Sequence, residues 1–449
     1  MNRITNTWIL SGLIFSLFAL SCKKDTLPGK KNTLPGNEST LSNRSNNAHA
    51  SQQYDDILSN SVILEWSIAA FEAAGGAAEG HPTLAARNKA MMHIAIHDAL
   101  NAIVPVYQQY AYHQQNTLAD PVAAAVSAAH TVLKATWPDY GPTLDTKLSE
   151  DLLNIPDGPG KTQGIDLGIA SGNAILALRA DDGANQNPVS DWPASSVPGV
   201  YIYVPPLTFV YGPLWGTVKL FSLQAPDQFR PAPPPGLNSP DYTRDFNEVK
   251  EVGEISSSIR TPDETAYGNW WYELADIGWN RIAQVQATQH NTGLYATARI
   301  FALMNMAMAD AYIAGWDAKY YYNFWRPYTA IHAAATDGND KTIADADWES
   351  LLLTPPVPDY PSGHCVLGNS AAAVLAYFFG NHSPFSMTST TAIPAGAVRS
   401  FDSFKKAADE NADSRVKIGI HFRFACDAGQ TQGDKIGQWT VKNHMEILH

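Results

Sequence analysis

Helical periodicity is the feature that most constrains the fold of this 449-residue chain. Apolar residues recur at helical spacing in four stretches before residue 185, and a further run extends from Tyr242 to Arg326. The four stretches are VILEWSIAAFEAA, PTLAARNKAMMHIAIHDALNAI, PVAAAVSAAHTVLKATW and GIDLGIASGNAILALRADD. Alternation of apolar and polar residues, which a half-buried strand requires, does not recur over any useful length. The chain is therefore expected to be all-α.

A proline-rich and aromatic-rich segment interrupts the helical pattern over residues 185–240, where the chain reads VYIYVPPLTFVYGPLWG. Compact domains usually keep such long irregular segments for function. We expect this segment to cover the core and to form one wall of an active-site channel. The length of the chain and its 45% hydrophobic content are sufficient for a sizeable core.

Three short clusters near the C-terminus combine fixed cations, histidines and a tight turn. They are KYYYNFWRP at 319–327, PSGH at 361–364 and SRVKIGIH at 414–421. Cationic side chains offset the charge of a tetrahedral oxyanion, while backbone N–H groups fix its orientation. One histidine can attack or ligate, and the other can move protons. The clusters together predict a site for phosphate or for its analogue vanadate.

The spacing within the first two clusters predicts how they are built. Lys319 and Arg326 are seven residues apart, which places them on one face of a helix that Pro327 would end or kink. The PSGH turn comes directly before a helical pattern that Gly380 closes. The turn is therefore expected at a helix N-terminus, where free N–H groups and the helix dipole favour an anion.

The third cluster requires a break in its helix. Arg415 and His421 are six residues apart, so a continuous helix would point them about 120° away from each other. Gly419 lies between them and is able to break the helix. We expect this break to bring both side chains to the same ion.

The order and spacing of the three clusters resemble the signature of the vanadium-dependent haloperoxidases and of the related acid phosphatases in the type-2 phosphatidic-acid phosphatase superfamily. The flanking segments WDAKYYYNFWRP, GWNRIA, HIAIHDALNAI and FSLQAPDQFRPAPPP are similar to those of the soluble bacterial haloperoxidase-like proteins. The resemblance extends over about residues 60–449. It implies two packed helical bundles, joined by long irregular connections, with the anion site at the end of one bundle.

The resemblance also implies a role for each residue of the clusters. His421 would ligate vanadium directly, or would form a phosphohistidine in a phosphatase. The oxygens of vanadate or phosphate would be held by Lys319, Arg326, Ser362, Gly363 and Arg415. His364 would be the acid–base residue, and Lys319 would also make bound hydrogen peroxide more electrophilic. Trp316 would line the halide pocket.

Two positions depart from the family pattern. The family commonly has Asp four residues after the ligating histidine, where the carboxylate orients the imidazole, and this chain has Ala425 there. Asp427 is the nearest substitute, and Asp317 or Asp310 could serve from upstream. Val357 stands where characterised haloperoxidases tend to carry Phe or His beside the halide, so it belongs to the predicted halide pocket.

Other candidate residues favour a structural role. His93 and His97 have a spacing that superficially resembles metal ligation, but their segment AMMHIAIHDALNAI is typical of an amphipathic core helix. Asp98 and Asn101 are expected to satisfy buried polar groups beside them.

Cys365 and Cys426 each lie next to a cluster that contributes to the anion site. Convergence of the clusters would bring these two residues together. Because an exported protein can be oxidised, they are a candidate disulfide, while packing as buried thiols is the alternative.

The N-terminus predicts export. The sequence MNRITNTWILSGLIFSLFALSC is typical of a lipoprotein signal peptide (residues 1–22) that leaves a lipidated Cys22, with a plain signal peptide as the alternative. A flexible tether over 23–55 and a helical haloperoxidase-like domain over 56–449 would follow. The protein would then be a lipoprotein of the bacterial cell envelope, at the periplasm or cell surface. A second membrane span is not expected.

The chain is thus expected to be a vanadate-dependent haloperoxidase. It would oxidise a halide with hydrogen peroxide to hypohalous acid, which reacts with a small organic acceptor. The two departures from the family pattern favour bromide and iodide over chloride. The alternative is a soluble, exported acid phosphatase that acts through a phosphohistidine. The net charge of −13 argues against a nucleic-acid partner.

Overall fold

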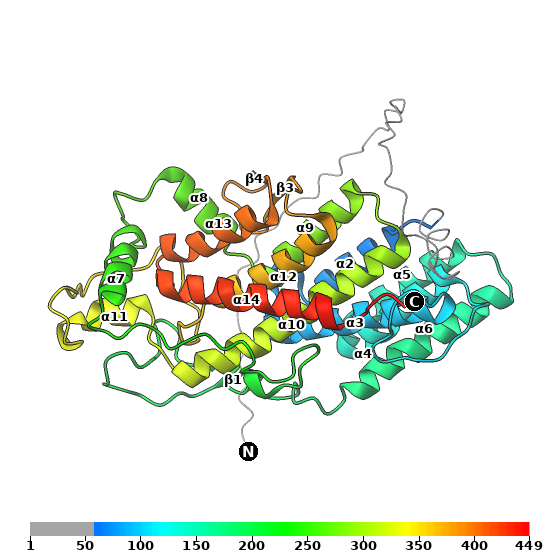
Figure 1. The fold of residues 1–449 in the computed structure, drawn as a ribbon, viewed down its shortest axis with the longest axis horizontal. Coiled ribbons are helices and arrows are strands. Elements are labelled where there is room, and N and C mark those ends of the chain that lie inside the picture. Colours follow the sequence, from blue (N-terminus) through cyan, green and yellow to red (C-terminus); the bar gives the residue numbers. More distant parts are fainter. Residues whose placement is uncertain (1–57, 449) are drawn as a thin grey trace, which may run out of the picture. The chain divides into compact units, whose positions relative to one another are not determined.

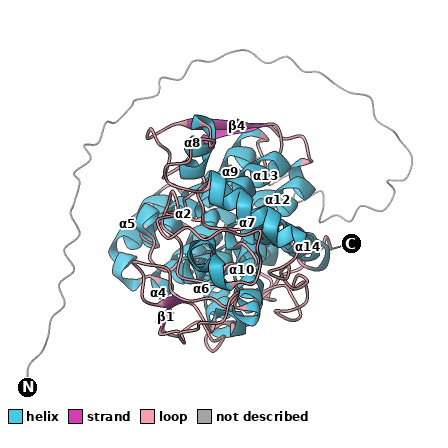
Figure 2. Cartoon of the chain, turned by 90° about the vertical axis from the view of Figure 1, so that its left-hand side faces the viewer, coloured by secondary structure: helices cyan, strands magenta, loops and turns pink. Residues whose placement is uncertain are grey.

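Thirteen α-helices and two small antiparallel sheets make up residues 58–448, the part of the chain that the computed structural model describes (Figure 1). The expected all-α class is confirmed. The helices are α2 (Ser61–Ala73), α3 (Pro82–Ile103), α4 (Pro121–Thr136), α5 (Gly141–Leu153), α6 (Pro159–Leu178), α7 (Pro240–Val252), α8 (Pro262–Trp270), α9 (Ala275–Gln289), α10 (Leu294–Tyr322), α11 (Pro327–Ala333), α12 (Gly363–Phe379), α13 (Phe404–Lys417) and α14 (Arg423–Asn443). Strand β1 (Val189–Ser190) pairs with β2 (Val210–Tyr211), and β3 (Phe385–Thr388) pairs with β4 (Val398–Phe401). Figure 2 shows these strands at the edges of the helical body.

The first bundle consists of α3, α4 and α6, with α2 and α5 packed on α4. Gly164, Gly168 and Gly172 lie one helical turn apart on the side of α6 that meets α4. A Cβ atom at Gly168 would lie 2.3 Å from the carbonyl oxygen of Ala124. The glycines therefore let the two helices approach until their backbones are almost in contact.

The second bundle uses the same device. It consists of α10, α12, α13 and α14, with α9 packed on α12. On α14, Gly429, Gly433 and Gly437 face α12, and a Cβ atom at Gly433 would lie 2.2 Å from the carbonyl oxygen of Val366. Helix α10 contacts α3 of the first bundle as well as α12 and α14 of the second, so it joins the two (Figure 1).

Helix α3 carries polar residues inside the first bundle. His93 and His97 are 1% and 0% exposed, which confirms that they belong to the core. Asp98 accepts three backbone N–H groups, and Asn101 accepts two, all from residues 106–112. These side chains therefore satisfy the buried backbone of the connection that follows the helix, as predicted.

The segment over 185–240 is mostly irregular, with β1, β2 and a single 3₁₀ turn at Trp215–Thr217. Two carboxylates of α10 hold it in place. Asp310 accepts the backbone N–H groups of residues 221–223 and the hydroxyl of Ser222, at 2.6–2.9 Å. Asp317 pairs with Arg230 at 2.6 Å. Both carboxylates are thus bonded to this segment.

Within residues 58–448, no helix is long and apolar enough to cross a membrane. The apolar stretch at 298–316 forms part of α10, and it is buried throughout. The predicted signal peptide, Cys22 and the whole of the tether lie outside the described residues.

We predict that Gly433→Ala lowers the free energy of unfolding by about 1–3 kcal/mol, because the added methyl group must push α14 away from α12. The matched control is Gly315→Ala within α10, where a Cβ atom would have its closest contact at 3.8 Å. That substitution should be neutral or stabilising by up to about 1 kcal/mol, since alanine is the better helix former. Urea denaturation of the purified variants measures both values, and equal stability of the two would contradict the prediction.

Candidate functional site

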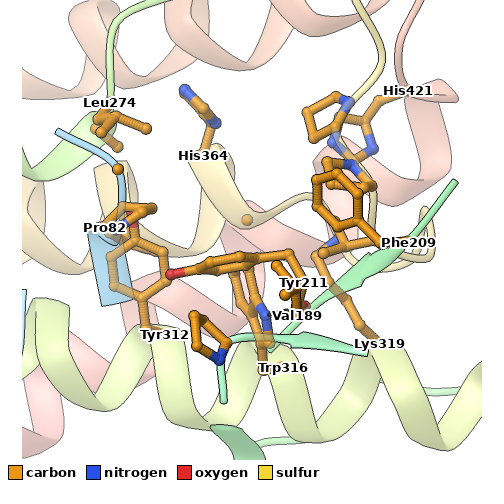
Figure 3. A pocket seen from close by; sticks show the side chains of 18 of the residues that line it. Pro82, Val189, Phe209, Tyr211, Leu274, Tyr312, Trp316, Lys319, His364 and His421 are labelled. Atoms are coloured by element: carbon orange, nitrogen blue, oxygen red, sulfur yellow. Dashed lines mark hydrogen bonds between the residues drawn. The ribbon is translucent and has the colours of Figure 1, made fainter. Parts of the chain in front are cut away.

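The three clusters converge on one cavity of about 330 Å³. Its lining includes Lys319, Arg326, Gly363, His364 and His421. In Figure 3, His364 and His421 lie along one side of the cavity, and Trp316 and Lys319 approach from the opposite side. The convergence that the sequence predicted therefore occurs.

The route by which Lys319 and Arg326 meet differs from the prediction. They do not share a helix, because α10 ends at Tyr322 and Asn323 adopts the left-handed conformation, with φ of 47°. Arg326 instead stands at the N-cap of α11, with extended backbone, and Pro327 begins that helix. The turn between the two helices brings the side chains together, whereas helical spacing was expected to do so.

Backbone carbonyl groups hold both cations. Lys319 Nζ donates to the carbonyl oxygens of Pro358 and Asp359, at 2.8 and 3.0 Å. Arg326 Nε donates to the carbonyl oxygen of Val357, and its Nη1 donates to that of Ile420, both at 2.7 Å. These bonds fix the cations and neutralise little of their charge.

Helix α12 begins at the PSGH turn and has Gly380 as its C-cap, as predicted. Ser362 is the N-cap residue, a position where a serine hydroxyl usually accepts a backbone N–H of the first turn. Here the side chain makes no such bond, and its Oγ is buried without a partner. A Cβ atom at Gly363 would lie 3.2 Å from the ring of Trp316, so glycine fits this close approach.

The break in the third cluster is confirmed. Helix α13 ends at Lys417, and Gly419 has a φ of 81°. Arg415, on the last turn of α13, is fully buried, and within residues 58–448 its Nη1 and Nη2 have no hydrogen-bond partner. Burial lowers the pKa of Arg415 to about 10, so the guanidinium remains charged at neutral pH.

These residues suit a tetrahedral oxyanion with two or more negative charges. We call the following set the cage: Lys319, Arg326, Asp359, Ser362, Gly363, Arg415 and His421. It contains three cations and one carboxylate. Three of its buried donors, Ser362 Oγ and both terminal nitrogens of Arg415, are without partners among the described residues. Unpaired buried donors are costly, and oxyanion acceptors would satisfy them.

The carboxylate against His421 is Asp359, not the predicted Asp427 or the upstream alternatives. Asp359 Oδ1 lies 2.7 Å from His421 Nδ1, and both side chains are buried. Asp427 is instead influenced by the nearby charges of Arg423, Glu248 and Arg244. Asp359 directly precedes the YPSGH segment, so the same turn that delivers Ser362 delivers this carboxylate. That adjacency was the available signal in the sequence.

This contact sets the chemistry of His421. Burial, reinforced by the charges of Arg326, Lys319 and Arg415, holds the pKa of His421 well below its usual range. Nδ1 of the neutral ring faces Asp359, and Nε2 faces Arg326, which can only donate, so Nε2 is the nitrogen that offers its lone pair. Nε2 points toward the cations, 3.1 Å from Arg326 Nη1. Burial also raises the pKa of Asp359 to about 7, against the opposing effect of Arg326 and Lys319.

His364 is also neutral. Burial, followed by the charge of Arg415, lowers its pKa to about 3. Its Nε2 lies 3.0 Å from the carbonyl oxygen of Glu273 and donates to it, so Nδ1 is the nitrogen that can accept a proton. Asn411 fixes the backbone by donating to the carbonyl oxygen of His364. A neutral histidine beside the cage is suited to taking up a proton.

The predicted halide-pocket residues line the same cavity. Trp316 and Val357 are 7% and 4% exposed and contribute to its wall. Trp316 Nε1 donates to the carbonyl oxygen of Tyr211, at 3.2 Å. The irregular segment over 185–240 thus supplies part of the wall, through Tyr211 and its neighbours.

The predicted disulfide is not formed. Cys365 and Cys426 are both free and buried, although their thiols are close enough to form a side-chain hydrogen bond. They belong to a hydrophobic cluster with Trp325, Tyr360 and Phe422, which are sequence neighbours of cage residues. The prediction of proximity was right, and the thiols serve as packing groups.

Comparisons with known proteins agree with this geometry. Residues 299–449 match the family model of the second helical-bundle domain of vanadium chloroperoxidase. The chain is 25% identical to a vanadium chloroperoxidase from Curvularia inaequalis, over 79% of this chain and 76% of that protein.

Two solved structures extend the likeness. The crystal structure of a bacterial vanadium-dependent iodoperoxidase matches with a TM-score of 0.76 and 26% identity, over 87% of this chain and 98% of that chain. A holo-type bacterial vanadium-dependent chloroperoxidase has the same fold, with a TM-score of 0.65 and 16% identity, over 81% and 92% of the two chains. Together with the convergence of the three clusters on one cage, these likenesses show that the chain is similar in sequence and fold to the vanadium-dependent haloperoxidases.

Proposed function

We propose that the protein is a vanadate-dependent haloperoxidase that oxidises a halide with hydrogen peroxide to hypohalous acid. The observation that carries this proposal is that the buried donors of Ser362 and Arg415 are without partners among the described residues, in the two clusters that also supply His364 and His421. An anion is the group that these atoms lack. The likeness to iodoperoxidase and chloroperoxidase structures supports vanadate as that anion.

Each cage residue has a task in this proposal. Lys319, Arg326 and Arg415 would hold the vanadate oxygens together with Ser362 and the first N–H groups of α12, and His421 Nε2 would ligate the metal. Bound vanadate supplies a Lewis acid that activates hydrogen peroxide without a change of oxidation state. Asp359, whose Oδ1 lies 2.7 Å from Nδ1 of His421, would orient the ring so that Nε2 serves as the ligand.

His364 would act as the general acid–base residue. Its neutral Nδ1 can accept a proton from hydrogen peroxide as the peroxide binds. Burial and then the charge of Arg415 disfavour the protonated ring, and a bound anion would offset the part that is due to Arg415. The same atom can return the proton to the departing oxygen. One further proton from solvent balances the reaction, in which hydrogen peroxide, halide and a proton give hypohalous acid and water.

The test separates this activity from phosphate-ester hydrolysis. The purified protein is loaded with orthovanadate, and oxidation of iodide and bromide by hydrogen peroxide is assayed beside hydrolysis of p-nitrophenyl phosphate by the protein without vanadate. We expect halide oxidation that depends on vanadate and is inhibited when phosphate competes during loading. Ester hydrolysis through a phosphohistidine, without halide oxidation, would favour the phosphatase alternative.

Substitutions of the two histidines are predicted to have different effects on vanadate binding and on rate. His421→Ala should abolish both vanadate retention and turnover, because it removes the ligand. His364→Ala should retain vanadate and lose about 10²–10⁴-fold in rate, since only proton transfer is affected. Equilibrium dialysis with orthovanadate and peroxidase assays measure the two effects. His290→Ala, at an exposed histidine after α9, is the control, and normal activity of the His421 variant would refute the assignment.

Asp359→Asn is predicted to weaken vanadate affinity by about 10–100-fold, because the neutral amide supports the imidazole less well than a carboxylate. The matched control is Asp427→Asn, two residues beyond the position at which the family commonly has Asp. That variant should bind vanadate as the unmodified protein does. Titration with orthovanadate, followed by recovery of activity, gives both affinities. An equal loss in the two variants would show that Asp359 has no special role.

We propose that the enzyme prefers iodide and bromide to chloride. Val357 lines the cavity with Lys319, Arg326 and His421, and it offers a small aliphatic wall at the position where the family resemblance implies Phe or His. Val357→Phe should raise the ratio of chloride to bromide turnover by about tenfold, because it makes the pocket tighter and drier. Steady-state assays with each halide measure this ratio. Strong chloride oxidation by the unmodified protein would refute the preference.

We propose that the protein is exported as a lipoprotein of the bacterial cell envelope. The support for this proposal is the sequence of residues 1–22, which ends at Cys22. Hydrogen peroxide and halide would then be met outside the cytoplasm.

A further inference from the structure

The cavity in front of the cage has an apolar wall built largely from aromatic rings. Several of the side chains that line it carry a polar atom, and in each case that atom is bonded behind the wall. The hydroxyl of Tyr211 lies 3.0 Å from Thr83 Oγ1 and 2.8 Å from His81 Nδ1. The indole N–H of Trp316 donates to the backbone carbonyl oxygen of Tyr211. The hydroxyl of Tyr312 hydrogen-bonds Asp276.

Carbon makes up the rest of the side-chain wall. It is completed by Pro82, Val189, Phe209, Leu274, Pro356 and Leu367. The polar side chains of the lining are Lys319, Arg326, His364 and His421, and they lie together at the cage. The cavity is therefore amphiphilic, with one reactive polar end and an apolar body. Figure 3 shows Leu274 and His421 on opposite sides of it.

The size of the cavity exceeds what halide and hydrogen peroxide need. Its volume is about 330 Å³, whereas an apolar cavity of about 150 Å³ can hold benzene. Volumes of this order are typical of sites for small organic ligands. Val189 is 41% exposed, so the cavity is reached from solvent past its rim.

We propose that this cavity binds an uncharged, electron-rich aromatic acceptor, and that the acceptor is halogenated there before hypohalous acid escapes. This inference rests on the proposed haloperoxidase function and names the substrate class of the same site. A charged acceptor is disfavoured, because the apolar body offers no partner to a second charge. Burial of the ring supplies the driving force for binding.

The chemistry balances without a further reactant. The halide gives two electrons to hydrogen peroxide, whose O–O bond breaks. The aromatic carbon then attacks the halogen, a carbon–halogen bond forms, and the ring proton leaves to water. In total, the arene, hydrogen peroxide, halide and one proton give the haloarene and two water molecules.

The test uses two probes with the same ring. 4-Propylanisole is uncharged, and 3-(4-methoxyphenyl)propanoate differs by a carboxylate at the end of the chain. Equal amounts of both are offered to the vanadate-loaded protein with bromide and hydrogen peroxide, and the ratio of brominated products is compared with that from reagent hypobromous acid. We expect the protein to favour the uncharged probe by about tenfold or more over the reagent. A ratio equal to that of the reagent would overturn the inference.

Variants that fill the cavity test whether the preference for the uncharged probe arises there. Leu274→Trp should bring the product ratio back to that of the reagent, while triiodide formation, which needs no acceptor, continues. Leu178→Trp, at an exposed leucine at the end of α6, should leave the ratio unchanged. If Leu274→Trp fails to fold, Val189→Trp at the rim provides the same test. Unchanged preference in a folded filled variant would contradict the proposed site.

Binding distinguishes failure of this inference from failure of the proposed function. 4-Propylanisole is titrated into the protein by calorimetry without hydrogen peroxide. Binding that Leu274→Trp abolishes and Leu178→Trp retains supports the site even if no halide is oxidised, in which case only the proposed function fails. Absence of binding to the unmodified protein would overturn the site itself.

Discussion

The concentration of three buried cations around one carboxylate is the constraint on which the rest of this structure depends. Burial lowers the pKa of Lys319, Arg326 and Arg415, and the charge of Arg326 lowers that of Lys319 further. Backbone carbonyl groups hold Lys319 and Arg326, Arg415 donates to Ser414 Oγ, and Asp359 is the one carboxylate nearby, 3.6 Å from Arg326, so much of the positive charge remains available. The residual charge is what makes an oxyanion the natural occupant, and burial together with this charge keeps His364 and His421 neutral.

Rigid packing supports the cage from behind. Trp325, Tyr360 and Phe422 each neighbour a cage residue in the sequence, and all three lie in one hydrophobic cluster. Each short segment therefore supplies a polar side chain to the cage and packs the neighbouring aromatic ring into the hydrophobic cluster. The ring of Phe422 stacks on that of Phe424, with centroids 5.0 Å apart. Helix α14 completes the support, because Gly429 lets its backbone approach the carbonyl oxygen of Ser362.

The sequence predicted the all-α class, the helix after PSGH and the break at Gly419 because these depend on local periodicity and backbone conformation. It failed where tertiary contacts decide. The left-handed Asn323 ends α10 within a pattern that is typical of a continuous helix. The local sequence therefore did not predict where this helix ends. The predicted carboxylates were Asp427, downstream of His421, and Asp317 or Asp310 on the helix before Lys319, whereas the side chain against His421 is Asp359, which precedes the PSGH cluster. The orientation of the polar atoms in the cavity wall likewise depends on contacts between distant segments.

The cage draws its residues from the end of α10, the N-terminus of α12 and the turn between α13 and α14, so an anion there connects three separate parts of the second bundle. Its binding free energy is then also free energy of folding. At a free concentration of 100 times its Kd, such a ligand stabilises the native state by about 2.7 kcal/mol. The cofactor thus acts as a reversible cross-link, and heat resistance of the protein should follow the supply of the anion in its surroundings.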